Sequence, residues 1–493
     1  MKNINDIVAP KKENHNVPSN SLLGGMHRAT SMTRTENNAL TYSRTQSPLL
    51  DFYALAGAMR NNEEDALDLF KKAFAVDRLK AIKILFYLRD VRGGQGERKL
   101  FRKCLQVVGE DFPEIFEKII KYVPEYGRWD DLFFDNEEAM IMISKQLSED
   151  VNADSPSLLA KWLPTINASS KSTKLKAKFI ADKIGLDHIN YRRAVRLIRK
   201  KIKTVEEKMS AKKWDKIDYK TVPSQASRIY RKAFYKHDEE RYKAFIDKAT
   251  KGEVKIQAKT LYPYQIYNSV KNNYDKTLEA LWTQLPDYTQ GKNAIVVADV
   301  SDSMSGNPMS VSVSLALYFA ERNKGQFKDH FITFSGNPTL QKITGKTLKE
   351  KMWNLERAHW EMNTDIQKVF DLILNTALQN SVPSEEMPET IYIISDMEFD
   401  EVTCSRYYDS SPQVTNFEMI KQKYEGAGYK KPNLVFWNVD ARQKNLPVEH
   451  NEQGVAMVSG FSPVIFKMAV ENKSSIEVME DTINSERYAQ IKI

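Results

Sequence analysis

A change in hydrophobic pattern near residue 290 is the feature that most constrains the fold. Before it, from about residue 48 to 285, apolar residues recur at intervals of three and four, as in FYALAGAM, ALDLFKKAFAV and RLKAIKILFYLRDV. This spacing predicts amphipathic helices. After it, short runs of β-branched and aromatic residues alternate with helical segments. The sequence therefore predicts an all-α part over residues 47–288 and an α/β part over residues 289–493.

The second part has the pattern of a doubly wound sheet. Strands are predicted at 293–299, 331–334, 390–396 and 433–438, and helices at 309–322 and 366–378. Strands that alternate with helices form a parallel sheet. Such sheets bind ligands at the carboxyl ends of their strands. Asp299 and Asp396 each end a predicted strand, so we expect both carboxylates at that edge.

Short turns divide the helical part into hairpins, which favours a stacked α-solenoid or an irregular bundle without a strict sequence repeat. One of these turns is the Gly-Gly-Gln-Gly run at 93–96. The arginines around it, which are Arg89, Arg92, Arg98 and Arg102, could hold phosphates or form structural ion pairs with aspartates. Trp129, in the Gly-Arg-Trp-Asp-Asp run, could anchor the core or stack on a nucleic-acid base, and the core role is expected.

The composition excludes several classes of protein. With 41% hydrophobic residues the chain can bury a sizeable core. No run approaches the roughly 18 apolar residues of a membrane span, so we expect no membrane partner. The two cysteines, Cys104 and Cys404, exclude a disulfide framework and fit a reducing, cytoplasmic location. The oligomeric state is left open.

Residues 1–46 are rich in Asn, Ser and Thr and poor in apolar side chains. Such a segment has little surface to bury against the cost of ordering its backbone. We therefore expect a disordered or weakly ordered arm whose removal changes the melting temperature by only a few degrees.

The charge of the chain is unevenly distributed. Residues 161–260 carry 28 Lys and Arg against 11 Asp and Glu, whereas residues 291–493 carry 21 against 27. A basic middle of this size indicates a polyanionic partner such as RNA, although solvated lysine-rich helices would show the same composition. The predicted RNA contacts are Arg192, Arg193, Arg196, Arg199, Lys200, Arg228, Arg231 and Lys232.

The strongest chemical signal is the run Asp299-Val-Ser301-Asp-Ser303 directly after a predicted strand. Thr364 could add a third hydroxyl and Asp396 a second carboxylate. Oxygen ligands of this kind suit Mg²⁺, or Mn²⁺ or Ca²⁺ in its place. Alternatively, the hydroxyls only cap the following helix.

This motif resembles the metal-ion-dependent adhesion site (MIDAS) of the von Willebrand factor A domain, whose pattern is Asp-x-Ser-x-Ser, then Thr, then Asp. In that family the serines coordinate the metal directly, the carboxylates often act through water, and one position stays open for an acidic residue of a ligand. Asp302 stands where that family often has glycine.

The two-part plan resembles the Ro autoantigens, whose helical part is the TROVE module. The runs RDVRGGQGERK, YGRWDDL, VPS and ISDMEFD resemble more closely a family of viral, bacterial and eukaryotic proteins with the same plan. The Ro resemblance implies HEAT-like helices that form a basic ring for small structured or misfolded RNA, with the A domain helping to close it.

These observations favour a non-enzymatic RNA-binding protein, working as a ribonucleoprotein component. The alternative is a metal-dependent interaction or assembly factor that grips an acidic residue of a partner protein. An enzyme is disfavoured because the seven histidines are scattered and no Ser-His-Asp or Cys-His arrangement is evident.

Overall fold

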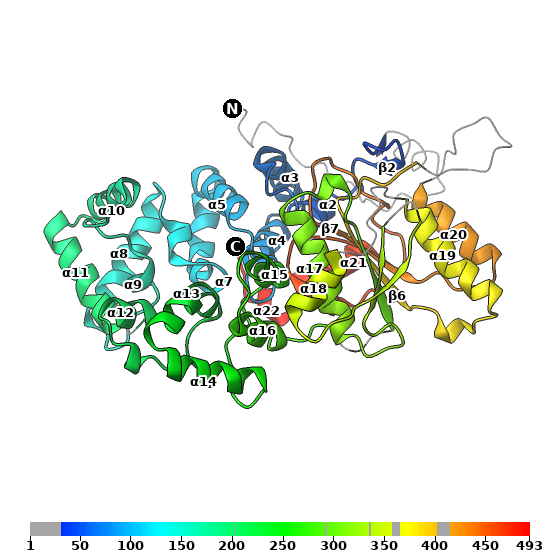
Figure 1. The fold of residues 1–493 in the computed structure, drawn as a ribbon. Helices are drawn as coiled ribbons and strands as arrows, with labels where there is room; N and C mark the ends of the chain where they lie inside the picture. Colours follow the sequence, from blue (N-terminus) through cyan, green and yellow to red (C-terminus); the bar gives the residue numbers. More distant parts are fainter. Residues whose placement is uncertain are drawn as a thin grey trace.

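The computed structural model describes residues 31–202, 204–289, 291, 293–334, 337–356, 365–401 and 415–493. In these residues a curved array of helices is followed by an α/β domain (Figure 1). The helices of the array are α2 (Pro48–Leu55), α3 (Glu63–Val76), α4 (Arg78–Arg89), α5 (Lys99–Asp111), α6 (Pro113–Ile119), α7 (Val123–Tyr126), α8 (Glu137–Asn152), α9 (Leu159–Trp162), α10 (Lys171–Lys183), α11 (His188–Lys201), α12 (Val205–Ser210), α13 (Ser224–His237), α14 (Glu239–Thr250), α15 (Pro263–Asn272) and α16 (Lys276–Thr283).

A six-stranded sheet forms the centre of the α/β domain within the described residues. Its strands are β3 (Ala294–Ala298), β4 (His330–Thr333), β5 (Leu340–Lys342), β6 (Thr390–Ser395), β7 (Asn433–Asn438) and β8 (Val455–Ser459). They lie in the order β5-β4-β3-β6-β7-β8, and only β5 runs antiparallel to its neighbour. The chain starts in the middle of the sheet and builds outward in both directions, so the strand order reverses between β3 and β6. The predicted parallel sheet is confirmed except at its edge, where β5 is antiparallel.

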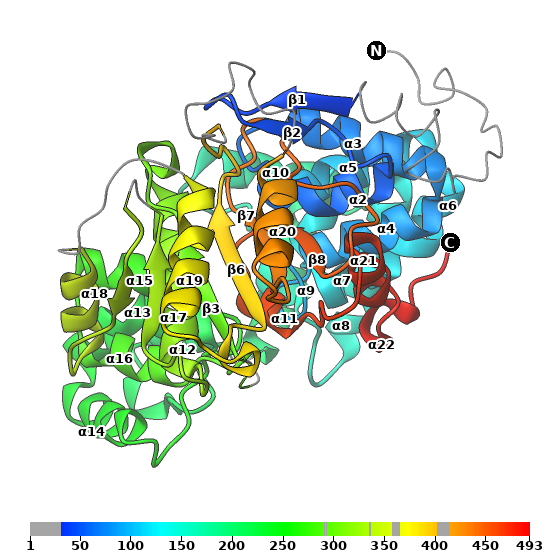
Figure 2. The ribbon, with the colours of Figure 1, turned by 90° about the vertical axis from the view of Figure 1, so that its right-hand side faces the viewer.

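Helices cover both faces of this sheet. The helices of the domain are α17 (Asn307–Arg322), α18 (Leu348–Glu356), α19 (Ile366–Gln379), α20 (Asn416–Gly426), α21 (Ser475–Ile483) and α22 (Glu486–Ala489). Figure 2 shows α19 and α20 side by side over one face. On the other face α17 is buried continuously over residues 311–320, because it packs between the strands and α15. A helix enclosed in this way can be apolar on all sides.

The helical array contacts the α/β domain at both of its ends. At the first end α2 packs on β8 and α4 packs on α21 and α22, and at the other end α15 packs on α17. Gly57, just after α2, donates its backbone N–H to Ser459 Oγ, and a Cβ at this position would lie 2.8 Å from the Ser459 carbonyl oxygen. The two predicted parts are therefore closely joined.

Residues 31–46 do not form the weakly ordered arm that the sequence indicated. Strands β1 (Met32–Arg34) and β2 (Leu40–Tyr42) make a hairpin whose Ala39 and Tyr42 side chains are buried. The hairpin is ordered by long-range bonds: Tyr42 and Leu446 exchange two backbone hydrogen bonds, and Thr35 donates to the Phe399 carbonyl. The rest of the predicted arm, residues 1–30, lies outside the described residues.

Candidate functional site

Two aspartates lie where the strand order reverses. Asp299 follows β3 and Asp396 follows β6, and these strands are parallel neighbours with Ala298 opposite Ile394. A reversal of strand order leaves a crevice at the carboxyl edge of the sheet. The structure thus brings together the two carboxylates that were predicted to share this edge.

Hydroxyl groups surround the Asp299 carboxylate. Its Oδ1 accepts the Ser301 backbone N–H at 2.9 Å, and its Oδ2 accepts the Ser395 hydroxyl at 2.6 Å. The Ser301 and Ser303 hydroxyls lie 2.9 Å apart. Burial, and then the negative charge of Asp396, raise the pKa of Asp299 to about 6. We call Asp299, Ser301, Ser303, Ser395 and Asp396 the strand-edge site.

Asp396 is neutralised by a side chain from another loop. Its Oδ1 accepts the Glu398 backbone N–H, and its Oδ2 accepts Nη2 of Arg442 at 2.8 Å. Sequence reasoning missed Arg442 and Ser395. Ser395 could have been predicted, because it directly precedes Asp396 at the end of the same strand. No pattern in the sequence around Arg442 indicates that it contacts this site.

The donor set of the strand-edge site fits a hard divalent cation. Its oxygens come only from carboxylates and hydroxyls, the ligands that Mg²⁺ prefers. In the described part of the chain no group of three or more His, Cys, Asp or Glu side chains is arranged to hold a metal. A cation here would therefore depend on the serine hydroxyls. The predicted third hydroxyl, Thr364, lies outside the described residues.

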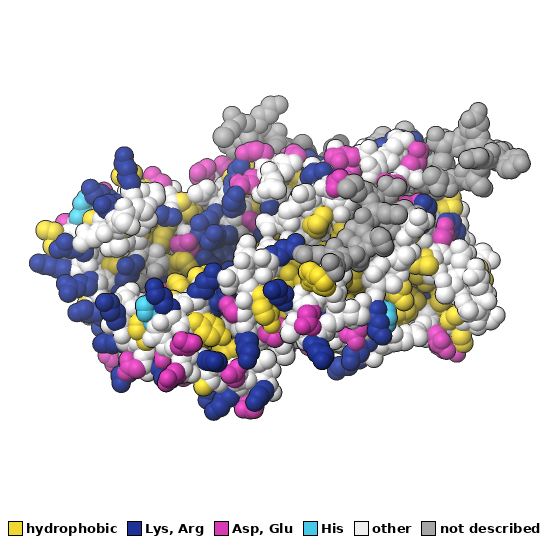
Figure 3. Space-filling view, viewed as in Figure 1, with side chains coloured by type: hydrophobic (Ala, Val, Ile, Leu, Met, Phe, Trp, Pro, Cys, Tyr) yellow, Lys and Arg dark blue, Asp and Glu magenta, His cyan; other side chains and the backbone are white. Residues whose placement is uncertain are grey.

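A second candidate is a basic hollow of about 900 Å³ along α11. The helix starts at the N-cap Asp187 and buries Tyr191, Val195 and Ile198 against the array. Its other face carries the five cations predicted from the sequence, and all of them line the hollow: Arg192, Arg193, Arg196, Arg199 and Lys200. Figure 3 shows Lys and Arg side chains spread densely over this helical half of the molecule.

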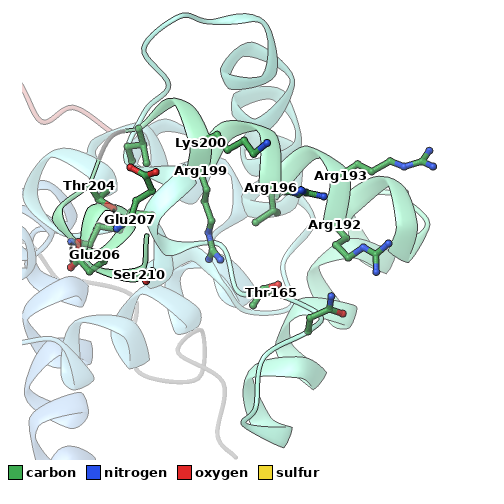
Figure 4. A pocket seen from close by; sticks show the side chains of 14 residues that line it. Thr165, Arg192, Arg193, Arg196, Arg199, Lys200, Thr204, Glu206, Glu207 and Ser210 are labelled. Atoms are coloured by element: carbon green, nitrogen blue, oxygen red, sulfur yellow. Dashed lines mark hydrogen bonds and ion pairs between the residues drawn. The ribbon is translucent and has the colours of Figure 1, made fainter. Parts of the chain in front are cut away.

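Four of these cations face solvent. Arg192, Arg193, Arg196 and Lys200 are exposed, and none of them forms an ion pair within the described residues. Arg199 differs, because its guanidinium donates to the Ala160 and Leu163 carbonyls at the end of α9. In Figure 4 Arg192 and Arg193 extend outward, while Arg199 points toward the segment that carries Thr165.

The predicted contacts on α13 are of mixed kind. Lys232 is exposed, but Arg228 donates to Gln225 and Ser269. Arg231 is only 7% exposed and bonds Asp275 at 2.6 Å as well as two carbonyl oxygens. Arg231 is therefore a buried structural residue whose guanidinium is already paired within the protein, which disfavours it as an RNA contact. Periodicity could not reveal its acidic partner, which lies 44 residues away.

The arginines near the Gly-Gly-Gln-Gly turn are mainly structural. Arg89 and Arg102 both bind Asp131, and Arg92 donates to the Glu125 carbonyl. The turn itself packs on the α/β domain, since a Cβ on Gly460 would lie 2.2 Å from Gln95 Oε1.

Trp129 is 5% exposed, as expected of a core anchor. Sequence reasoning missed Arg128, which follows Gly127 and lies over the Trp162 ring at 4.5 Å. Burial lowers the pKa of Arg128, and the positive charges of Arg89 and Arg98 lower it further. Arg89, Arg98 and Arg128 thus form a further group of cations in the helical array.

None of the described helices has the length and apolar character to cross a membrane.

Comparisons with known proteins place the chain in a family. Residues 293–492 match the model described as "Domain of unknown function (DUF7788)". The chain is also similar to "Uncharacterized protein L728" of Acanthamoeba polyphaga mimivirus, with 28% identity over 484 residues that cover 88% of this chain and 83% of the relative. Residues 35–120 and 137–299, together about half of the chain, match a second model, which begins in the hairpin and ends just after β3. The chain therefore belongs to the family described as "Domain of unknown function (DUF2828)".

Proposed function

We propose that the chain is a non-enzymatic RNA-binding protein with the plan of the Ro proteins. In this proposal a HEAT-like helical module binds small structured or misfolded RNA, and a von Willebrand factor A-like domain carries a divalent-metal site. The basic hollow is the observation that carries the proposal. Four exposed cations that form no ion pair with the described residues follow one helix there, and such groups bind phosphates largely without regard to sequence.

The length of the basic segment of α11 and the charges that line the hollow support this assignment. From Arg192 to Lys200 the helix rises about 12 Å, at about 1.5 Å per residue, which matches a few phosphates of an RNA backbone. The acidic groups in the lining are Glu206 and Glu207, and Glu206 is already paired with Lys161 at 3.1 Å. The cations on α11 are therefore left to attract an external anion.

The A-domain part of the proposal has two supports. The strand order places Asp299 and Asp396 at the reversal point, and the serines of the Asp-x-Ser-x-Ser run lie beside Asp299. In addition, the helical array meets the α/β domain at both ends, as a ring closed by that domain requires. When bound, the cation would supply positive charge and an open coordination position. Asp299 and Asp396 would neutralise it, and Ser301 and Ser303 would orient it.

Salt-dependent RNA binding tests the proposal. The variant Arg192→Gln/Arg193→Gln/Arg196→Gln is compared with Lys243→Gln/Lys248→Gln/Lys251→Gln, which removes the same charge from exposed positions of α14 and its end. Fluorescence anisotropy with a structured RNA hairpin gives affinity against salt. The α11 variant should flatten the slope of log affinity against log salt by about 2 to 3, or roughly 0.7 to 0.9 per lost phosphate contact. Equal slopes for the two variants would refute the assignment, and EDTA should change RNA affinity little.

One observation favours a second candidate, a metal-dependent protein-interaction factor. A hollow of about 690 Å³ lies beside the strand-edge site, lined by Val300 and Asn307 and by Lys271 of α15. An acidic residue of a partner protein could reach a cation from this hollow. A pull-down distinguishes the two candidates. A protein partner would stay bound after ribonuclease treatment and be released by EDTA, whereas RNA would be lost with ribonuclease and stay bound in EDTA.

A further inference from the structure

Arg442 is the only described side chain that supplies a positive charge to the strand-edge site by a direct ion pair. It comes from the loop after β7, and its Nη2 lies 2.8 Å from Asp396 Oδ2. The Asp396 side chain is fully buried, whereas that of Arg442 is 36% exposed. A buried carboxylate next to a second one needs a counter-charge, and Arg442 provides it without a metal.

The hairpin at residues 31–46 holds the Arg442 loop in place. Glu36 lies 3.4 Å from the same Nη2 atom, and its backbone N–H donates to Glu398 Oε2 at 2.7 Å. The other Glu398 oxygen accepts Asn445 Nδ2, also at 2.7 Å. Together with the bonds between Tyr42 and Leu446, these contacts join the loops after β6 and β7. Arg442 is thus positioned by groups from three segments.

The strand-edge site is internally satisfied in this arrangement. Each oxygen of Asp299 and each oxygen of Asp396 accepts a hydrogen bond from the protein. A divalent cation would face both these existing bonds and the charge of Arg442. Like charges a few ångströms apart repel strongly in a partly buried site.

We propose that the Arg442 guanidinium competes with a divalent cation for the strand-edge site and so sets its metal affinity. Arg442 is a positioning and affinity-determining residue, because it acts through Asp396 and is not itself a ligand. The inference rests on the metal site of the proposed function and is independent of RNA binding.

Manganese titration tests the competition. Free Mn²⁺ is measured by electron paramagnetic resonance for the full chain and for Arg442→Gln. The control is Lys444→Gln, which removes an equal charge from the same loop but breaks only the ion pair with Asp65 of α3. Arg442→Gln should bind Mn²⁺ about tenfold more tightly than the unaltered chain, and Lys444→Gln should stay within about twofold.

Thermal melting gives a second readout. In EDTA, Arg442→Gln should melt below the unaltered chain because Asp396 loses its counter-charge, and Mn²⁺ should raise its melting temperature more than that of the unaltered chain. If Arg442→Gln does not fold, Arg442→Lys keeps the charge without the planar fork and should bind about two- to threefold more tightly.

The outcomes separate the two proposals. Unchanged or weaker Mn²⁺ binding by Arg442→Gln would overturn the competition and leave the metal site standing. No Mn²⁺ binding by any variant would overturn both the metal site and the competition, and it would leave the RNA-binding proposal untouched.

Discussion

Asp131 connects two arginines in the helical array, and its removal should be costly. The carboxylate accepts Arg89 Nε at 2.8 Å and Arg102 Nε at 2.6 Å, and its Oδ2 also accepts the Arg128 backbone N–H at 2.9 Å. The Asp131 side chain is fully buried and that of Arg89 is 4% exposed. In Asp131→Asn, an amide N–H would face an arginine N–H, and the Arg89 charge would be buried without a counter-charge.

The expected loss is about 3 to 5 kcal/mol of unfolding free energy, the range for one broken partner of a buried pair. The neighbouring Asp130 is a matched control. Among the described residues its one ion pair is with Arg102 at 2.7 Å, and both side chains are partly exposed. For Asp130→Asn the loss should be about 1 kcal/mol or less.

Equilibrium urea unfolding, followed by circular dichroism and tryptophan fluorescence, measures both losses. The double variant Arg89→Met/Asp131→Leu should recover part of the stability, because it removes the buried charge together with its partner. If Asp131→Asn and Asp130→Asn differed by less than about 1 kcal/mol, the argument from burial would be refuted.

Three further predictions concern the strand edge and the turn. Asp299→Ala/Ser301→Ala should abolish Mg²⁺ or Mn²⁺ binding in calorimetry while circular dichroism stays unchanged; an unaltered affinity would contradict the ligand assignment. Burial raises the pKa of Glu398 to about 7, from an ordinary value of 4.5. Between these two pH values Glu398 is protonated in the folded state and ionised in the unfolded state. The free energy of unfolding therefore falls as the pH rises toward 7. In EDTA, Glu398→Gln should show a shallower fall between pH 5 and 8, and an unchanged fall would assign it to other groups. Gly94→Ala should lower the melting temperature far more than Gly426→Ala, because a Cβ at Gly94 would lie 1.8 Å from the Tyr87 carbonyl oxygen, whereas nothing lies within 4 Å of a Cβ at Gly426, which has no positive φ. Equal effects would contradict the tight turn.

Local patterns were sufficient for the centre of the α/β domain. Strands β3, β6 and β7 are buried along almost their whole length, so each is a continuous apolar run that stands out in the sequence. Strand β5 was missed because its three residues lie at the edge of the sheet and carry the polar Gln341 and Lys342. Strand β8 was also missed, although its five residues are all buried.

Contacts between distant segments could not be predicted. The hairpin at residues 31–46 has few apolar side chains, and its order depends on partners about 360 to 400 residues later. Arg442 and Arg231 are both arginines in unremarkable surroundings, and only the fold pairs one with Asp396 and the other with Asp275. The charge pattern located the basic helix α11 correctly, but it could not separate the exposed arginines from those that stabilise the array.

The packing of α4 on α21 and α22 also affects how the chain is synthesised. The buried Asp90 carboxylate, just after α4, accepts Arg487 and the Tyr488 hydroxyl, and these residues are made about 400 positions later. At about 5 to 20 residues per second, translation of that interval takes roughly 20 to 80 s. During this time the Asp90 carboxylate has only the local backbone N–H groups of Arg92 and Gly93 as partners, and the apolar surface of the first helices is open. They cannot reach their final packing until Tyr488 has left the ribosome, so this interface forms only after nearly the whole chain has been made.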